Sequence, residues 1–148
     1  GFREQYGLDG KTVILGAASV WDKEKGLLDF CRLREKLDSR FAIVLVGVTE
    51  KQKRKLLPGI LALPRTASPG ELAKIYSAAD VFVNPTHQDT YPTVNLEARA
   101  CGTPVITYDV CGSPESAGGK YIVKENDIDG LAEQIYKLTE REAVELSV

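Results

Sequence analysis

The sequence contains no methionine, even at position 1, and it has only one histidine and three cysteines. Because translation starts with methionine, its absence predicts that this is a piece of a longer chain. The cysteines are Cys31, Cys101 and Cys111, and no CxxC or paired Cys/His spacing joins them. This pattern argues against a disulfide framework and against a zinc site, so we expect reduced, largely buried thiols.

Long apolar runs are also missing. No stretch approaches the roughly 18 to 20 apolar residues of a membrane span, and the N-terminus has no signal-peptide core. These absences predict a cytoplasmic protein. The one dense basic stretch, Lys-Gln-Lys-Arg-Lys at residues 51–55, is expected to be a solvated helix face. Weak peripheral association with the inner face of the membrane is the alternative for this stretch.

Several function classes lack their signatures. The formal net charge of −2 gives no electrostatic basis for binding nucleic acid. No Gly-x-Gly-x-x-Gly, Walker A or Gly-x-Ser-x-Gly pattern is present, which argues against common dehydrogenases, P-loop enzymes and α/β-hydrolases. The composition, with 43% hydrophobic and 27% charged residues in 148 positions, instead indicates one soluble globular domain over residues 1–148.

Apolar runs rich in β-branched residues alternate with helical patterns along the chain. This alternation is typical of βα units on a parallel sheet whose two faces are covered by helices. We therefore predict a Rossmann-like, three-layer α/β/α domain with a parallel sheet of about six strands. The predicted strands are Thr12–Ala17, Phe41–Val46, Ile60–Leu63, Val81–Asn84, Pro104–Thr107 and Tyr121–Val123.

Apolar stripes at helical spacing predict the main helices. One helix should begin at Ser68-Pro69-Gly70-Glu71, where a serine cap is followed by proline at the first position and glutamate at the third. The stripes are Leu27, Phe30, Leu33 and Leu37, then Leu72, Ile75, Tyr76 and Ala79, and finally Leu131, Ile135 and Leu138.

Ligands of open parallel sheets bind beyond the carboxyl ends of the strands. Residues 84–106, which start at the end of the fourth predicted strand, contain the most residues that could carry chemistry. Pro92 suits a first helical position, which predicts a helix from about Pro92 to Cys101 with Gly102 as its left-handed C-cap. The free N–H groups at its start would form an anion site for a pyrophosphate. Glu97, over a turn further along, is placed to accept both hydroxyls of a ribose.

This segment resembles the acidic-x7-acidic motif of the retaining group 1 glycosyltransferases, which have the GT-B fold of two Rossmann-like domains. Asp89 and Glu97 are the two acids, and Glu-Ala-Arg-Ala-Cys-Gly-Thr-Pro-Val-Ile continues the pattern. The likeness extends through residues 76–85 and through Val-Cys-Gly-Ser-Pro-Glu at 110–115. It implies that residues 1–148 are the C-terminal, nucleotide-sugar-binding domain of such an enzyme, with the N-terminal acceptor domain absent from this chain.

The resemblance gives the two acids their roles. Glu97 would hold the ribose, with an exposed structural carboxylate as the alternative. Asp89, in place of the family's usual glutamate, would contact hydroxyls of the donor sugar. The alternative for Asp89 is a loop-stabilising bond from its side chain to the backbone.

The resemblance also assigns the remaining substrate contacts. Lys25 would neutralise the donor diphosphate and Gly26 completes the family's Lys-Gly pair, with a solvent-facing lysine as the alternative. The arginine that precedes this pair in the family is absent, and Lys23 or a residue outside the chain would have to replace it. Thr66 is expected at the nucleobase. Phosphate contacts are expected from the loop that contains Thr90, Tyr91, Pro92 and Thr93.

Some residues that suggest metal binding or a substrate contact have simpler structural interpretations. Asp127 and Asp129 form an acidic-x-acidic triplet that holds a metal in another glycosyltransferase fold, but here they precede the final helix and are expected to cap it. His87 lies beside the loop that carries Asp89, and no second ligand or nucleophile accompanies it in the sequence. A substrate contact is therefore its weaker interpretation. Trp21 would either close over the donor or make a core or interdomain contact.

The complete enzyme implied by the resemblance transfers a sugar, with retention, from a uridine or guanosine diphosphate sugar to an acceptor glycan or lipid-linked glycan. Cell-surface polysaccharide assembly is the implied setting. Lys25 and helix N–H groups would neutralise the charge that Mg²⁺ neutralises elsewhere, so no metal or cofactor is expected. This chain alone is expected to be inactive. A nucleotide-sugar epimerase domain of GT-B fold and a degenerate Rossmann-like module that binds a partner protein are the alternatives.

Overall fold

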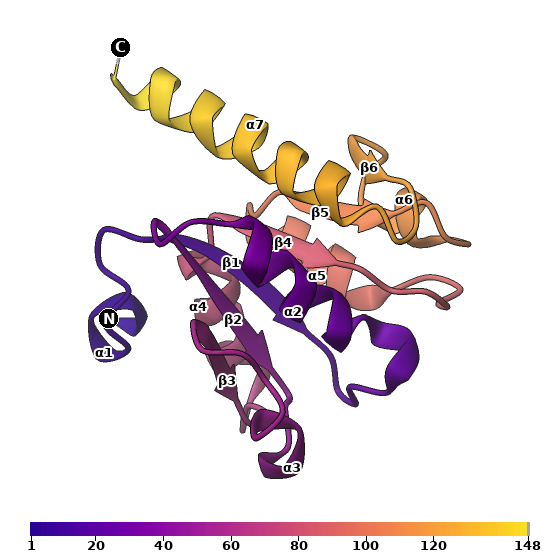
Figure 1. Ribbon diagram of the computed structural model, residues 1–148, viewed down its shortest axis with the longest axis horizontal. Helices are drawn as coiled ribbons and strands as arrows, with labels where there is room; N and C mark the ends of the chain where they lie inside the picture. Colours follow the sequence, from indigo (N-terminus) through magenta and orange to yellow (C-terminus); the bar gives the residue numbers. More distant parts are fainter. Residues whose placement is uncertain (148) are drawn as a thin grey trace.

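The computed structural model describes residues 1–147 and confirms the predicted Rossmann-like domain. Within those residues, six parallel strands form one sheet in the order β3-β2-β1-β4-β5-β6 (Figure 1). The strands are β1 (Thr12–Ala17), β2 (Phe41–Val46), β3 (Ile60–Leu63), β4 (Val81–Asn84), β5 (Val105–Tyr108) and β6 (Tyr121–Val123).

The strand predictions are confirmed apart from a one-residue shift in the fifth. β5 pairs with β4 from Val105 onward, one residue later than the predicted Pro104–Thr107. Pro104 has no N–H to donate to the ladder and contributes only its carbonyl, which accepts from Phe82 N at 2.9 Å.

Helices cover both faces of the sheet. In Figure 1, α2 lies in front of the sheet and α4 lies behind it. The three predicted apolar stripes lie on α2, α4 and α7. The helical segments are α1 (Phe2–Gln5), the 3₁₀ turn η1 (Lys23–Lys25), α2 (Leu27–Lys36), α3 (Glu50–Lys53), α4 (Pro69–Ala78), α5 (Thr93–Ala100), α6 (Ser113–Ser116) and α7 (Ile128–Ser147).

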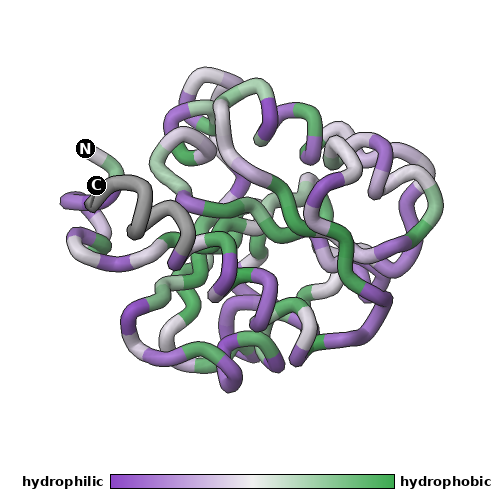
Figure 2. The backbone as a smooth tube through the Cα atoms, turned by 90° about the horizontal axis from the view of Figure 1, so that it is seen from above, coloured by the Kyte–Doolittle hydropathy of each residue, from purple (hydrophilic) through white to green (hydrophobic). Residues whose placement is uncertain are grey.

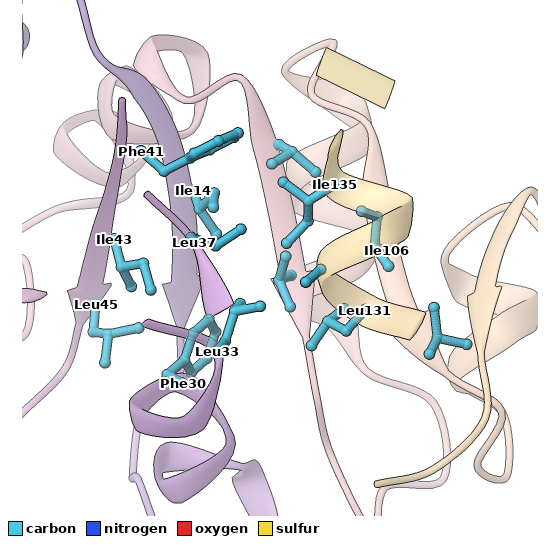
Figure 3. Close-up of a cluster of buried hydrophobic side chains, with 14 of the residues drawn as sticks. Ile14, Phe30, Leu33, Leu37, Phe41, Ile43, Leu45, Ile106, Leu131 and Ile135 are labelled. Atoms are coloured by element: carbon cyan, nitrogen blue, oxygen red, sulfur yellow. The ribbon is translucent and has the colours of Figure 1, made fainter. Parts of the chain in front are cut away.

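Two apolar clusters, one on each face, hold the layers together. Successive strand residues point to opposite faces, so Ile14 packs with α2 and α7 while Leu15 packs against the face that α4 and α5 cover. Figure 3 shows Phe30 and Leu33 of α2 approaching Leu131 of α7 over the strands. Each such fully buried side chain contributes about 1.5 to 3 kcal/mol to folding.

Side-chain caps define several helix starts as the sequence predicts. Ser68 Oγ accepts from Glu71 N at 3.3 Å, and the Glu71 carboxylate accepts from Ala67 N at 3.0 Å. Asp127 Oδ1 accepts from Gly130 N at 2.9 Å, which confirms a capping role for the first acid of the Asp127/Asp129 triplet. The short helices α1, α3 and α6 carry no predicted apolar stripe because four residues are too few to show one.

Apolar strands occupy the middle of the molecule and polar segments its outside, as the hydropathy colouring of Figure 2 shows. Among the helices that are described, none is both long and apolar enough to cross a membrane. The prediction of largely buried thiols is wrong for Cys111, which is exposed, while Cys31 and Cys101 are half-buried. The basic residues 51–55 lie in and after α3, and their Lys and Arg side chains are exposed as predicted.

The strand order creates one special point at the carboxyl edge of the sheet. The chain moves outward from β1 through β2 to β3, then returns to β4 on the other side of β1. The connections that leave β1 and β4 therefore diverge, and the crevice between them is where open α/β sheets bind ligands. Lys25 follows β1 and Asp89 follows β4, so the fold brings the two predicted residues to this crevice.

Candidate functional site

Two cavities contain most of the predicted site residues, and α5 lines both. The Lys25 cavity, of about 250 Å³, lies between the segments that follow β1 and β4. The Glu97 cavity, of about 510 Å³, lies between α5, α4 and the segment that follows β3. The first turn of α5 lines the Lys25 cavity, and its later residues line the Glu97 cavity.

A larger cavity, of about 920 Å³, opens between α1 and α4. Of the predicted site residues, only Thr66 lines it. We place the candidate site at the two smaller cavities because the predicted charged residues converge there.

Lys25 and Asp89 form an ion pair across the Lys25 cavity. The distance from Lys25 Nζ to Asp89 Oδ2 is 2.8 Å, and the side chains are 31% and 21% exposed. The pair joins the end of η1 to the loop after β4, although the two residues are 64 positions apart. Lys25 is thus paired rather than directed only to solvent, and Asp89 bonds to the side chain of Lys25 rather than to the backbone.

Gly26 permits the close approach that this pair needs. Its φ is +90°, in the left-handed region, and a Cβ atom there would lie 2.3 Å from the carbonyl oxygen of Pro85. A larger residue would push the start of α2 away from the loop after β4. The glycine of the Lys-Gly pair therefore has a packing reason of its own.

The start of α5 is one residue later than predicted. Pro92 is the N-cap, with extended backbone, and the helix begins at Thr93 and ends at Ala100. Gly102 has the predicted left-handed conformation, with φ +79°. Proline has no side-chain acceptor, so no side chain caps the first N–H groups of α5, and Pro92, Thr93 and Val94 line the Lys25 cavity. This uncapped start suits an anion.

A buried polar network fixes the start of α5, and sequence reasoning missed it. Asn95, fully buried, accepts from Asn84 Nδ2 at 3.0 Å and donates to Ser113 Oγ at 3.1 Å and to Ser116 Oγ at 3.0 Å. Thr107 Oγ1 in turn donates to Asn84 O at 2.9 Å. Satisfied buried networks rigidify their surroundings. The only sequence signal is a single polar residue in each of two otherwise apolar strands, Asn84 and Thr107.

Glu97 lies on the exposed side of α5, at the Glu97 cavity, with Thr66 among the residues across it. Tyr76 of α4 donates its hydroxyl to Glu97 Oε2 at 2.9 Å. Burial, reinforced by the nearby Glu97 carboxylate, raises the pKa of Tyr76, so its hydroxyl stays protonated and remains a donor. One carboxylate oxygen is thereby oriented, and the cavity holds the residues predicted for ribose and base on facing elements.

The rest of the loop after β4, which carries Asp89, packs against the segment after β5. A Cβ atom on Gly112 would lie 1.8 Å from the carbonyl oxygen of Thr90, so Gly112 and Thr90 are in close backbone contact. Tyr91 is 44% exposed and lines the Lys25 cavity. Trp21 also reaches that cavity, but it is 5% exposed and donates Nε1–H to Val46 O at 2.9 Å. Trp21 is therefore a core residue.

His87 is not isolated, contrary to the sequence interpretation. Its Nε2 lies 2.9 Å from Asp29 Oδ1 and its Nδ1 lies 2.8 Å from Glu125 Oε2. Asp29 also accepts a short hydrogen bond from the hydroxyl of Tyr108. Neither acid is near His87 in sequence, so no local spacing could have revealed them.

Among the residues that the structure describes, no lysine or arginine other than Lys25 lines the Lys25 cavity. Lys23 lies on η1 but is exposed and does not line the Lys25 cavity. Across the described part of the chain, no group of three or more His, Cys, Asp or Glu side chains is arranged to hold a metal ion.

The strand order defines a Rossmann-like domain, and a lysine–carboxylate pair and an uncapped helix start lie at its crevice. Domains of this class bind ligands at that crevice. Comparison with known proteins narrows the class. The family model described as glycosyl transferases group 1 matches residues 11–141. The chain therefore belongs to the group 1 glycosyltransferase family.

Two curated relatives illustrate the similarity. The alpha-galactosylglucosyldiacylglycerol synthase of Streptococcus pneumoniae is 31% identical over 112 residues, which cover 69% of this chain and 30% of that protein. The D-inositol 3-phosphate glycosyltransferase of Corynebacterium jeikeium is 30% identical, and the match covers 92% of this chain and 37% of that protein. The chain thus spans about a third of these relatives.

A solved structure shares the fold. Anabaena Alr3699/HepE in complex with UDP-glucose superposes with a TM-score of 0.81 at 19% identity, covering 96% of this chain and 43% of that chain. At this identity the likeness shows the fold alone. The agreement confirms the predicted Rossmann-like architecture of this domain.

Proposed function

We propose that this chain is the donor-binding domain of a glycosyltransferase and that its two cavities hold the two halves of a nucleoside-diphosphate sugar. The observation that carries the proposal is the convergence of Lys25, Asp89 and the uncapped start of α5 on one cavity. The diphosphate would lie there, against the Lys25 ammonium and the N–H groups of Thr93 and Val94.

The nucleoside would extend along α5 into the Glu97 cavity. Glu97 is one turn beyond Thr93 and exposes a carboxylate that Tyr76 orients. A carboxylate in this setting accepts hydrogen bonds from both ribose hydroxyls. Thr66, on the facing loop, would contact the base. UDP is the first nucleotide to test, because the structural neighbour Alr3699/HepE was solved with UDP-glucose.

Donor binding requires an exchange of partners at the ion pair. The structure pairs Lys25 with Asp89, the acid that we expect to contact the sugar. A diphosphate would draw the ammonium toward itself because it offers more negative charge than one carboxylate. Asp89 would then be free to accept hydrogen bonds from sugar hydroxyls, and Thr90, Tyr91 and Pro92 would close the loop over the donor.

The chemistry of the complete enzyme follows from this arrangement. As the bond from sugar to diphosphate breaks, negative charge grows on the leaving group, and Lys25 and the α5 N–H groups stabilise that charge. We propose that transfer retains the anomeric configuration and needs no metal. The acceptor, a glycan or a lipid-linked glycan, would bind mainly to a further domain, because this chain spans only about a third of its curated relatives. Membrane association through residues 51–55 stays a prediction.

Isothermal titration of the chain with UDP and with GDP tests the donor site. We expect one nucleotide to bind selectively, with equal affinity in EDTA and in Mg²⁺, and Lys25→Ala and Glu97→Ala each to weaken binding. Absence of binding by the folded chain would contradict the proposal and favour a module that binds a partner protein. Product analysis with the full-length protein then separates retaining transfer from inversion and from epimerisation.

A further inference from the structure

His87 and the Lys25–Asp89 pair connect the same two segments of the chain. On the α2 side, Lys25 and Asp29 are one helical turn apart. On the loop after β4, His87 and Asp89 are two residues apart, so the His87–Asp29 and Lys25–Asp89 bonds join the same two segments. The backbone adds a third link, because His87 N donates to Glu24 O at 2.7 Å.

The geometry around His87 favours a charged ring. Both ring nitrogens lie within 2.9 Å of a carboxylate oxygen, Asp29 on one side and Glu125 on the other. A neutral imidazole has one N–H, so its unprotonated nitrogen would face a carboxylate lone pair. Only the imidazolium donates to both acids. Asp29 is 4% exposed, and a buried carboxylate without this cation would keep only the hydroxyl of Tyr108 as its partner.

We propose that protonated His87 is a positioning residue for the donor. By bridging Asp29 and Glu125, it holds the loop after β4 at the distance from η1 at which Lys25 and Asp89 can both reach the donor. This inference rests on the donor-binding function proposed above. Loss of the proton from His87 releases one bridge and lets the loop that carries Asp89 move away from Lys25.

The groups that face His87 predict the sign of the pH dependence. Burial lowers the pKa of His87, but hydrogen bonds and charge from Asp29 and Glu125 outweigh it and raise the pKa above the usual 6.5. Tyr108 of β5, whose ring centroid is 5.4 Å from that of His87, stays protonated. From α2 and the turn before α7, Arg32 and Asp127 act on Tyr108 rather than on the ring. A raised pKa in the folded state means that the bridge is complete at low pH and is lost as pH rises through that pKa.

His87 is the only histidine, so its ring proton resonance in the untagged chain reports its pKa without ambiguity. The probe is UDP-glucose, or GDP-mannose if the chain selects guanosine, because an esterified diphosphate does not ionise in this pH range. We expect affinity to fall about tenfold as pH rises through the pKa of His87. By linkage, a saturating donor must then raise that pKa by about 1.

Matched variants separate positioning from general stability. In Glu125→Gln one carboxylate is lost, so the pKa of His87 and the pH midpoint of donor affinity should fall together. In Glu133→Gln, a surface acid paired with Lys137 on α7, neither should move. His87→Gln should bind the donor about tenfold more weakly than wild type at low pH and equally at high pH.

The outcomes are distinguishable. Donor binding that is independent of pH, together with a pKa of His87 that the donor leaves unchanged, overturns the inference while the proposed function stands. If the wild-type chain binds no nucleotide at any pH, the proposed function and the inference fail together. The donor-induced change in the pKa of wild-type His87 decides the question even if His87→Gln does not fold.

Discussion

The two cavities on either side of α5 are built in different ways. The Glu97 cavity lies between α4, α5 and the segment after β3, where Glu97 is exposed on α5 and a single bond from Tyr76 orients it. The Lys25 cavity joins segments that follow different strands, and ion pairs, a glycine contact and a buried polar network hold them together. Both halves of the candidate site depend on tertiary structure, but one has a single side-chain bond to its acid and the other has several contacts between distant segments.

Gly26→Ala should disturb the Lys25 cavity most. The substitution adds a methyl group 2.3 Å from a carbonyl oxygen at a left-handed residue, and we expect a loss of about 3 kcal/mol of unfolding free energy. Gly102→Ala is the matched control, because Gly102 is also left-handed but has open space around it and should cost only about 1 kcal/mol. Urea denaturation measures both. Equal losses would show that the approach to Pro85 has no special importance.

Lys25→Ala tests the charge in the same cavity. Removing the ammonium from the diphosphate should weaken UDP binding about 30-fold, measured by calorimetry. Lys23→Ala, on the same 3₁₀ turn but outside the cavity, should leave the affinity unchanged. If Lys23→Ala weakens binding as much as Lys25→Ala, the diphosphate lies elsewhere.

Glu97→Ala tests the other cavity through the ribose. The wild-type chain should bind UDP about tenfold more tightly than 2′-deoxy-UDP, because the deoxy sugar lacks one hydroxyl that Glu97 accepts. In Glu97→Ala the two nucleotides should bind equally. A preference for UDP that survives the substitution would place the ribose away from Glu97.

Asp89→Asn should give the smallest effect and the opposite sign. Without the carboxylate, Lys25 is no longer paired, so UDP itself should bind about threefold more tightly, a modest gain because both side chains are partly exposed. The advantage of UDP-glucose over UDP should shrink, since Asp89 is the expected contact of the sugar. If Asp89→Asn strengthened the binding of UDP-glucose by the same factor as the binding of UDP, the contact between Asp89 and the sugar would be contradicted.

The sequence predicts the parts of this molecule that depend on local patterns. Apolar runs predict the strands because the four inner strands are buried on both faces and the two edge strands are half-buried. Ser68 and Asp127 predict caps because the bonds are local. Lys25 and Asp89 could be found through the resemblance to the group 1 glycosyltransferases, and Glu97 also through its place one turn into the helix that follows the fourth strand. The start of α5 is misplaced by one residue because proline suits both the N-cap and the first helical position.

Contacts between distant segments could not be predicted in this way. Asp29 and Glu125 flank His87 from 58 and 38 residues away, and nothing in their own surroundings indicates a histidine partner. The Lys25–Asp89 ion pair could not be predicted for the same reason, although the sequence identifies each residue separately as a site candidate. The pattern indicates which residues reach an edge, and only the packed structure shows which of them meet.

The most direct test of the central claim is to map backbone amide shifts of the ¹⁵N-labelled chain as UDP-glucose is added. The account predicts that the largest shifts appear at both cavities together, at Lys25, Gly26 and Thr93 on one side and at Thr66 and Glu97 on the other. Shifts confined to one cavity, or centred on the space between α1 and α4, would contradict a donor site that spans α5.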